Sequence, residues 1–186
     1  DNNHGQLDAA QQAIGAPPAG RRIRIAHVDT GYDPNHVTRP AHLRADLQRN
    51  FVDDGKPNDA TDRSRDNVLT NFGHGTATLA LLAGGPFDAG QQHLGAASGF
   101  EVVPIRVADS VILFRNSAIA QAFDYVHSLW DKPDRRVHVI TISMGGVASA
   151  AWTDAVNALY ERGVFIVTAA GNNFGNLPTR FTVYPA

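Results

Sequence analysis

Short apolar runs alternate with segments of helical periodicity along most of the chain. Strands rich in β-branched residues are predicted at 23–28, 102–107, 137–142 and 164–168, with a shorter strand near 51–52. Helices are predicted at 7–14 and 73–82, and along the apolar stripes that run from Ile119 to Trp130 and from Trp152 to Tyr160. Gly163 stands where the cap of the last helix requires a glycine.

The strands are nearly continuous apolar runs, which is typical of strands that are covered on both faces. Their alternation with helices predicts an α/β fold, a doubly wound parallel sheet with helices on both faces. We divide the chain into an N-terminal arm, residues 1–22, and one domain, residues 23–186. Because parallel strands end at one edge of the sheet, Asp29, Ser143 and Gly171 are expected to gather there.

Composition narrows the classes of function. Of 186 residues, 43% are hydrophobic and 18% charged, which is typical of a globular domain. The formal net charge of −2 lacks the basic field of a nucleic-acid-binding protein, so no nucleic-acid partner is expected. The absence of cysteine excludes disulfides, zinc–thiolate sites and a thiol nucleophile. No apolar run reaches the roughly 18 residues of a membrane span.

Asp29 is the first candidate for chemistry, in the motif Val28-Asp29-Thr30-Gly31. A carboxylate after a buried strand can be a nucleophile, a metal ligand or the partner of a histidine, while a turn-forming Asp is the simpler interpretation. Aspartic proteases also use Asp-Thr-Gly, but in all-β lobes. A phosphatase of the haloacid-dehalogenase type needs a second Asp where Gly31 stands.

His74 and Asn172 are the other candidates. His74 begins a predicted helix, and the helix dipole disfavours a cation there, so we expect a lowered pKa and a neutral ring suited to a general base. Taken alone, a surface histidine is an equally good interpretation. Asn172 follows the last strand, where its amide could donate to an oxyanion or form an ordinary turn.

Four motifs and their order resemble the subtilisin-like serine proteases, the subtilase family. They are Asp-Thr-Gly at 29–31, His-Gly-Thr at 74–76, Ser-Met-Gly-Gly at 143–146 and Ala-Ala-Gly-Asn at 169–172. The order Asp, then His, with Ser last is also that of the family. The resemblance covers about residues 20–186, including Tyr-Pro-Ala at the end. It implies a subtilisin-like fold and a secreted serine endopeptidase that acts on polypeptides through an acyl-enzyme.

The resemblance also implies roles for individual residues. Asp29 would orient His74, His74 would carry the proton from serine to the leaving amine, and Asn172 would serve the oxyanion hole. The implied substrate-binding residues are Asp109, Ser110, Val111, Ser143, Met144, Gly145, Ala169, Ala170 and Gly171. The pocket residues among them are small or apolar, so we expect an apolar or modest-sized side chain before the scissile bond. Similar turnover of substrates with acidic and with Phe or Leu side chains there would contradict this expectation.

The family's nucleophile motif, Gly-Thr-Ser-x-Ala, does not occur in the chain. We therefore expect the serine in a companion segment or chain, and expect this chain alone to be inactive. The alternative is a non-catalytic subtilase-like fragment or pseudoenzyme that acts as a peptide-binding or interaction domain. A generic α/β protein for a small ligand is disfavoured because Gly-x-Gly-x-x-Gly and Walker motifs are absent.

No cofactor is expected, with calcium as the one open alternative. The segment 36–43 has no Asp in a region where many family members bind calcium. An acidic loop carries Asp53, Asp54, Asp59, Asp62 and Asp66. We interpret this loop first as solvated surface and second as a calcium site.

Overall fold

The computed structural model describes residues 6–15, 22–64, 70–86, 94–113, 117–146, 149–171 and 184. The helices are α1 (Leu7–Ile14), α2 (His74–Ala83), α3 (Ser117–Ser128) and α4 (Ala150–Glu161), with one 3-10 turn, η1 (Ala45–Leu47). The strands are β1 (Arg24–Asp29), β2 (Arg49–Asn50), β3 (Glu101–Arg106), β4 (Ile112–Leu113), β5 (Val139–Ile142), β6 (Gly145–Gly146) and β7 (Phe165–Thr168).

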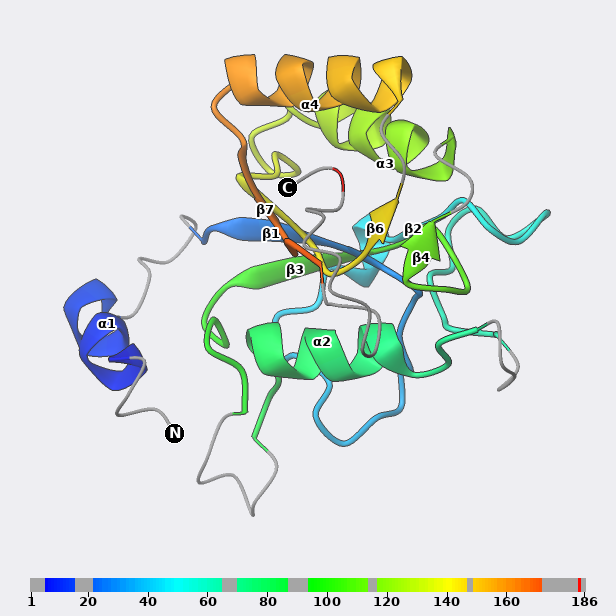
Figure 1. Cartoon of the computed structure of the whole chain (residues 1–186). Coiled ribbons are helices and arrows are strands. Elements are labelled where there is room, and N and C mark those ends of the chain that lie inside the picture. The colour runs from blue at the N-terminus through cyan, green and yellow to red at the C-terminus, as the bar shows by residue number, and fades with distance from the viewer. Residues whose placement is uncertain are drawn as a thin grey trace, which may run out of the picture.

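Five strands form a parallel sheet in the order β2-β3-β1-β5-β7. Helix α2 lies on one face of this sheet, and α3 and α4 lie on the other (Figure 1). The predicted α/β fold with helices on both faces of a parallel sheet is therefore confirmed. β1 occupies the middle of the sheet, so its carboxyl end, at Asp29, is surrounded by the ends of β3 and β5.

Apolar side chains on the two faces of the sheet form separate cores. The main core lies between the sheet and the α3–α4 pair, where Trp152, Phe123 and Ile140 are fully buried. A smaller core lies under α2 and includes Leu79 and Val102. Because every residue of β1 is buried between these two layers, a polar side chain on this strand must find protein partners.

The structure differs from the sequence prediction at the short strands. β2 ends one residue before the predicted 51–52 strand, because its position is set by pairing of Arg49 with Ile105 of β3. β4 and β6 were not predicted, since two residues are too short to show a period. The prediction that all long strands are covered on both faces is wrong for β7, the edge strand, where Phe165 is 67% and Val167 46% exposed.

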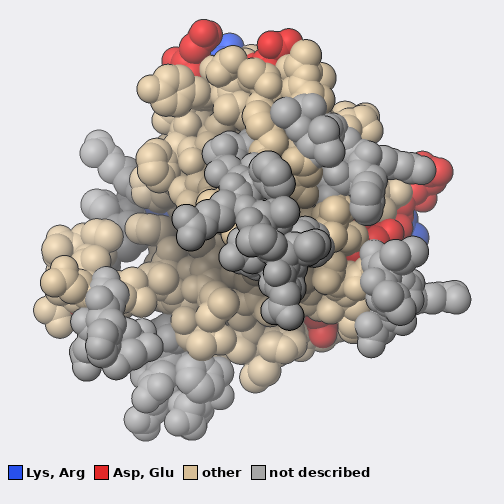
Figure 2. Space-filling model, viewed as in Figure 1, with Lys and Arg blue, Asp and Glu red and all other residues tan. Residues whose placement is uncertain are grey.

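Charged groups on the face shown in Figure 2 lie near its margins, with acidic side chains over α4 and at the right-hand side. Within the described part of the chain, no helix is both long and apolar enough to span a bilayer.

Candidate active site

Asp29 and His74 meet at the carboxyl edge of the sheet. Asp29 is the last residue of β1 and His74 is the first residue of α2. Nδ1 of His74 lies 2.7 Å from Oδ1 of Asp29, a hydrogen bond between residues that are 45 positions apart. The fold therefore unites the two residues that the sequence singled out separately.

The Asp29 carboxylate is buried and receives donors on both oxygens. Asp29 is 0% exposed, whereas the side chain of His74 keeps 28% of its surface in solvent. Besides His74, Oδ1 accepts the backbone N–H of Thr30 at 2.7 Å, and Oδ2 accepts the hydroxyl of Thr78 at 2.9 Å. These donors fix the plane of the carboxylate and compensate its burial.

The electrostatic environment of the pair keeps Asp29 ionised beside the imidazole of His74. Burial alone would raise the pKa of Asp29, but the His74 hydrogen bond, the two nearby histidines and the Thr30 N–H together lower it. The hydrogen bond to Asp29 raises the pKa of His74 above 6.5, against the opposing effect of burial. The expected lowering of the His74 pKa by the helix dipole is therefore wrong, because a carboxylate in contact outweighs a partial charge.

Gly75 allows α2 to approach the Asp29 loop closely. Its N–H donates to the hydroxyl of Thr30 at 3.1 Å. A Cβ at this position would overlap the carbonyl oxygen of Gly31 and lie 3.1 Å from Oδ1 of Asp29. A glycine is thus required at the contact between the helix and the loop.

Asp62, through its side chain, and Asn71, through its backbone carbonyl, hold the segment that leads into α2. Asp62, which is buried, accepts the N–H of Gly73 at 2.9 Å. The carbonyl of Asn71 accepts the N–H of His74 at 3.0 Å, and its side-chain oxygen accepts the N–H of Val111, also at 3.0 Å. Asn71 therefore links the histidine to one of the predicted substrate-binding segments.

Two residues of the acidic loop, Asp53 and Asp59, are paired with arginines. Arg106, 1% exposed and opposite Asp29 in the sheet register, donates to Asp53 and Asp109. Asp59 accepts hydrogen bonds from Thr61 and Arg63, and these bonds lower the pKa of Asp59 to about 2. Among the described residues, no group of three or more His, Asp or Glu side chains could hold a metal ion, and Asp66 lies outside those residues.

The predicted substrate-binding segments lie side by side. The 109–111 segment leads into β4, which pairs with β6, and the N–H of Gly145 donates to the carbonyl of Val111 at 3.2 Å. Met144 is 3% exposed and belongs to the main core.

After β7, Ala170 and Gly171 are exposed, and Ala169 donates its N–H to Ile142 at 3.2 Å. Asn172 lies outside the described residues, so the oxyanion and pocket assignments stay predictions.

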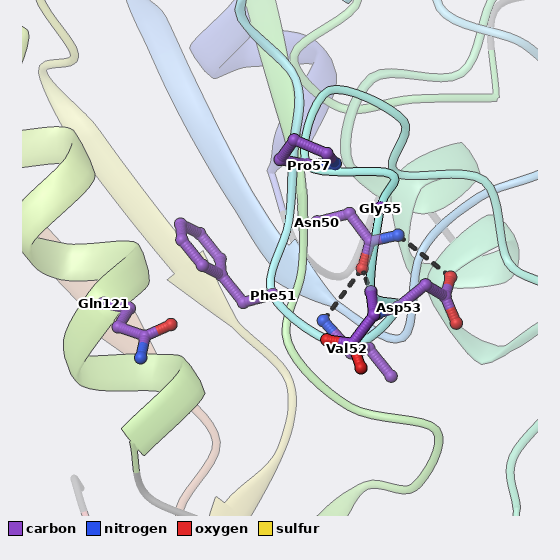
Figure 3. A pocket seen from close by; sticks show the side chains of 8 residues that line it. Asn50, Phe51, Val52, Asp53, Gly55, Pro57 and Gln121 are labelled. Carbon is purple, nitrogen blue, oxygen red and sulfur yellow. Dashed lines mark hydrogen bonds between the residues drawn. The ribbon is translucent and has the colours of Figure 1, made fainter.

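A separate pocket of about 380 Å³ lies beside β2 and α3 (Figure 3). It is lined by Asn50, Phe51, Val52, Asp53, Asp54, Gly55, Pro57 and Gln121, none of which is a predicted site residue. The amide of Asn50 is already bonded to Asp53 and to the N–H of Val52. The amide of Asn50 is therefore not available to a ligand in this pocket.

Sequence reasoning missed the residues that support the pair. Thr78 lies four positions after His74, on the same face of α2, and could have been found from that spacing. His27 lies two positions before Asp29 and therefore on the same face of β1. Its signal was a histidine between apolar residues of the strand, Ala26 and Val28.

The structure is thus an α/β fold in which a buried aspartate at the end of a central strand is hydrogen-bonded to a histidine at the start of a helix. The chain belongs to the subtilase family, whose model matches residues 20–186.

Known relatives agree with this membership. Subtilisin-like protease 3 of Arthroderma benhamiae is 31% identical over 156 residues, covering 83% of this chain and 34% of the relative. Subtilisin-like protease 7 of Arthroderma gypseum is 30% identical over 155 residues, with the same coverage. The chain thus spans about a third of the length of these relatives.

Sphericase has a similar fold, with a TM-score of 0.67 at 22% identity over 96% of this chain and 55% of sphericase. Fervidolysin from Fervidobacterium pennivorans, described as a keratinolytic enzyme related to subtilisin, has a TM-score of 0.56 at 25% identity over 91% of this chain and 23% of fervidolysin.

Proposed function

We propose that the full-length protein is a serine endopeptidase of the subtilisin type, to which this chain supplies the acid–base pair. The observation that carries the proposal is the 2.7 Å hydrogen bond between His74 and a fully buried Asp29. Since Asp29 holds Nδ1, Nε2 is the nitrogen left to exchange a proton with a nucleophile and a leaving group.

In the proposed reaction, Nε2 of His74 accepts the serine proton as the serine oxygen bonds to the substrate carbonyl carbon. Asp29 stabilises the imidazolium that forms, and Asn172 donates to the oxyanion. The imidazolium then protonates the leaving amine as the peptide bond breaks, leaving an acyl-enzyme. Water, deprotonated by the same nitrogen, attacks the acyl carbon and releases the acid. No cofactor takes part in these steps.

We place the nucleophilic serine in a companion segment or chain, so that residues 1–186 alone are inactive. Two observations support this part of the proposal. The chain spans 34% of the length of its curated relatives. In addition, the outer edge of β7 and its apolar Phe165 and Val167 are exposed, as expected of a strand that another segment covers. Secretion is proposed on the family resemblance alone.

A peptide substrate would enter between the 109–111 and 143–145 segments. There it must exchange the existing bond from Gly145 to Val111 for bonds to its own backbone. The backbone groups of Gly145 and Val111 would then bond to the peptide instead of to each other, so neither group loses its partner.

Labelling of the full-length protein with a fluorophosphonate tests the proposed function. We expect one serine outside residues 1–186 to gain the probe, as read by intact mass and peptide mapping. Substitution of His74 by Gln should slow labelling strongly, because the serine then has no base. Absence of labelling in the wild-type protein would reject the protease and favour the non-catalytic, peptide-binding alternative.

The pH dependence of the full-length enzyme should report the pair. Catalysis requires neutral His74, and contact with Asp29 raises the pKa of His74 above 6.5. We therefore expect kcat/KM to rise with pH through a single-proton step whose midpoint lies above 6.5. Steady-state kinetics on a peptide substrate across this range measures the midpoint. A midpoint at or below 6.5 would contradict the assigned contact.

A further inference from the structure

His27 is a buried histidine that the proposed mechanism does not use. It lies on the α2-facing side of β1 beside Asp29, and it is 3% exposed. Its neighbours across the sheet, Pro104 and Thr141, carry no charge. Its Nε2 lies 2.9 Å from the hydroxyl of Thr78 and 3.7 Å from Oδ2 of Asp29. A chain of contacts therefore runs from His27 through Thr78 to the carboxylate.

The available donors and acceptors determine which group donates in each of these contacts. The Thr78 hydroxyl has one proton, and its candidate acceptors are Oδ2 of Asp29 at 2.9 Å and the carbonyls of His74 and Gly75 at 3.2 and 3.3 Å. The ionised oxygen in a dry site is the strongest acceptor and the nearest of the three. Thr78 therefore donates to Asp29, and Nε2 of His27 must carry the proton that it donates to Thr78.

The neutral state of His27 matches this role. Burial has the largest effect on the pKa of His27 and lowers it. The Asp29 carboxylate opposes this effect, while the charge of His74 lowers the pKa further. A neutral ring can donate through Nε2–H without placing a second cation beside Asp29. The carboxylate is thus left to stabilise the imidazolium of His74 alone.

We propose that His27 is a positioning residue of the acid–base pair. Its Nε2–H holds the Thr78 hydroxyl so that Thr78 donates to Oδ2 of Asp29, which leaves Oδ1 directed at His74. The expected effect of His27 on the rate rests on the proposed protease function. Its expected effect on the titration of His74 does not depend on that function.

Variants of similar size separate donation by His27 from simple filling of space. Leucine at position 27 keeps the bulk and removes the donor, glutamine places an N–H near Nε2, and asparagine is too short to reach Thr78. In the full-length enzyme we expect His27→Leu and His27→Asn to lose about 10- to 100-fold in kcat with little change in KM. His27→Gln should remain within about threefold of wild type.

Non-additivity provides an independent test. Thr78→Val removes the middle of the chain of contacts, so the double variant with His27→Leu should be no slower than Thr78→Val alone. A purely structural effect of His27 predicts losses that multiply instead. Multiplying losses, or a His27→Leu kcat within twofold of wild type, would overturn the proposal. If His27→Leu does not fold, equal rates for His27→Gln and His27→Asn overturn it.

NMR titration of His74 tests the contact without reference to turnover. In His27→Leu the Thr78 hydroxyl loses the donor that holds and polarises it, so its hydrogen bond to Oδ2 weakens. More of the carboxylate charge then acts on His74, and the pKa of His74 should rise further. An unchanged titration overturns the inference even if the wild-type protein is not labelled by the fluorophosphonate. The control is His138→Leu, which removes a histidine bonded to Arg24 at the opposite end of β1 and should leave both kcat and the titration unchanged.

Discussion

Replacement of Asp29 by Asn should lower kcat of the full-length enzyme by about 10⁴-fold, the loss that follows removal of the carboxylate from a serine protease triad. The imidazolium that forms on His74 then has no carboxylate beside it. The midpoint of the kcat/KM profile should also fall, because the negative charge that raises the pKa of His74 is lost and the remaining acceptor is a neutral oxygen. Kinetics from pH 5 to 9 measure both effects.

The hydrogen bonds around Asp29 indicate how the asparagine would sit. The N–H of Thr30 can only donate, so the amide oxygen is expected to keep the Oδ1 position. The amide nitrogen then faces Thr78, whose hydroxyl can accept and turn to the carbonyl of His74. The tautomer of His74 is preserved in this arrangement, so the loss reports the missing charge.

Asp33→Asn is the matched control for this prediction. It removes one charge from the same loop, but the Asp33 side chain is exposed and accepts only the local N–H of Asn35. We expect less than about threefold change in kcat and no change in the midpoint. A loss of less than tenfold in Asp29→Asn, with the midpoint unmoved, would show that Asp29 does not act on His74 during turnover.

The sequence predicted the fold and the pair because both leave local signals. Long apolar strands have a clear pattern, and Asp29 and His74 each stand in a short motif directly at the end or start of an element. The position of β2 and the exposure of β7 could not be predicted, because they depend on which strand lies alongside and which segment covers the sheet.

The supporting residues and the pKa of His74 required the three-dimensional structure. In the sequence, His27 and Thr78 each lie within a largely apolar element. Only their 2.9 Å contact in the structure indicates that they support the Asp29–His74 pair. The pKa of His74 follows from a carboxylate 45 residues earlier in the chain, which outweighs the local helix dipole. The sequence thus indicated the candidate pair, whereas the residues that support it were found only through long-range contacts.

Gly75→Ala should destabilise the full-length protein by about 3 kcal/mol, the upper end of the usual cost of overpacking, and also slow labelling by the fluorophosphonate. The added methyl group overlaps the carbonyl oxygen of Gly31, which is backbone and cannot swing aside. Alanine favours helices over glycine by at most about 1 kcal/mol, so the gain does not offset the overlap. To relieve it, α2 must move away from β1, which lengthens the contact between His74 and Asp29.

Gly163→Ala separates this overlap from the general cost of replacing a glycine. Gly163 has a φ of +80°, and a Cβ there would meet nothing within 4 Å. Only backbone strain remains, about 1–2 kcal/mol, with labelling of the folded protein unchanged. Urea unfolding and labelling rates of both variants measure the difference. Equal stability of the two variants would mean that α2 and the Asp29 loop can separate freely. The close approach at Gly75 would then not be needed to hold His74 against Asp29.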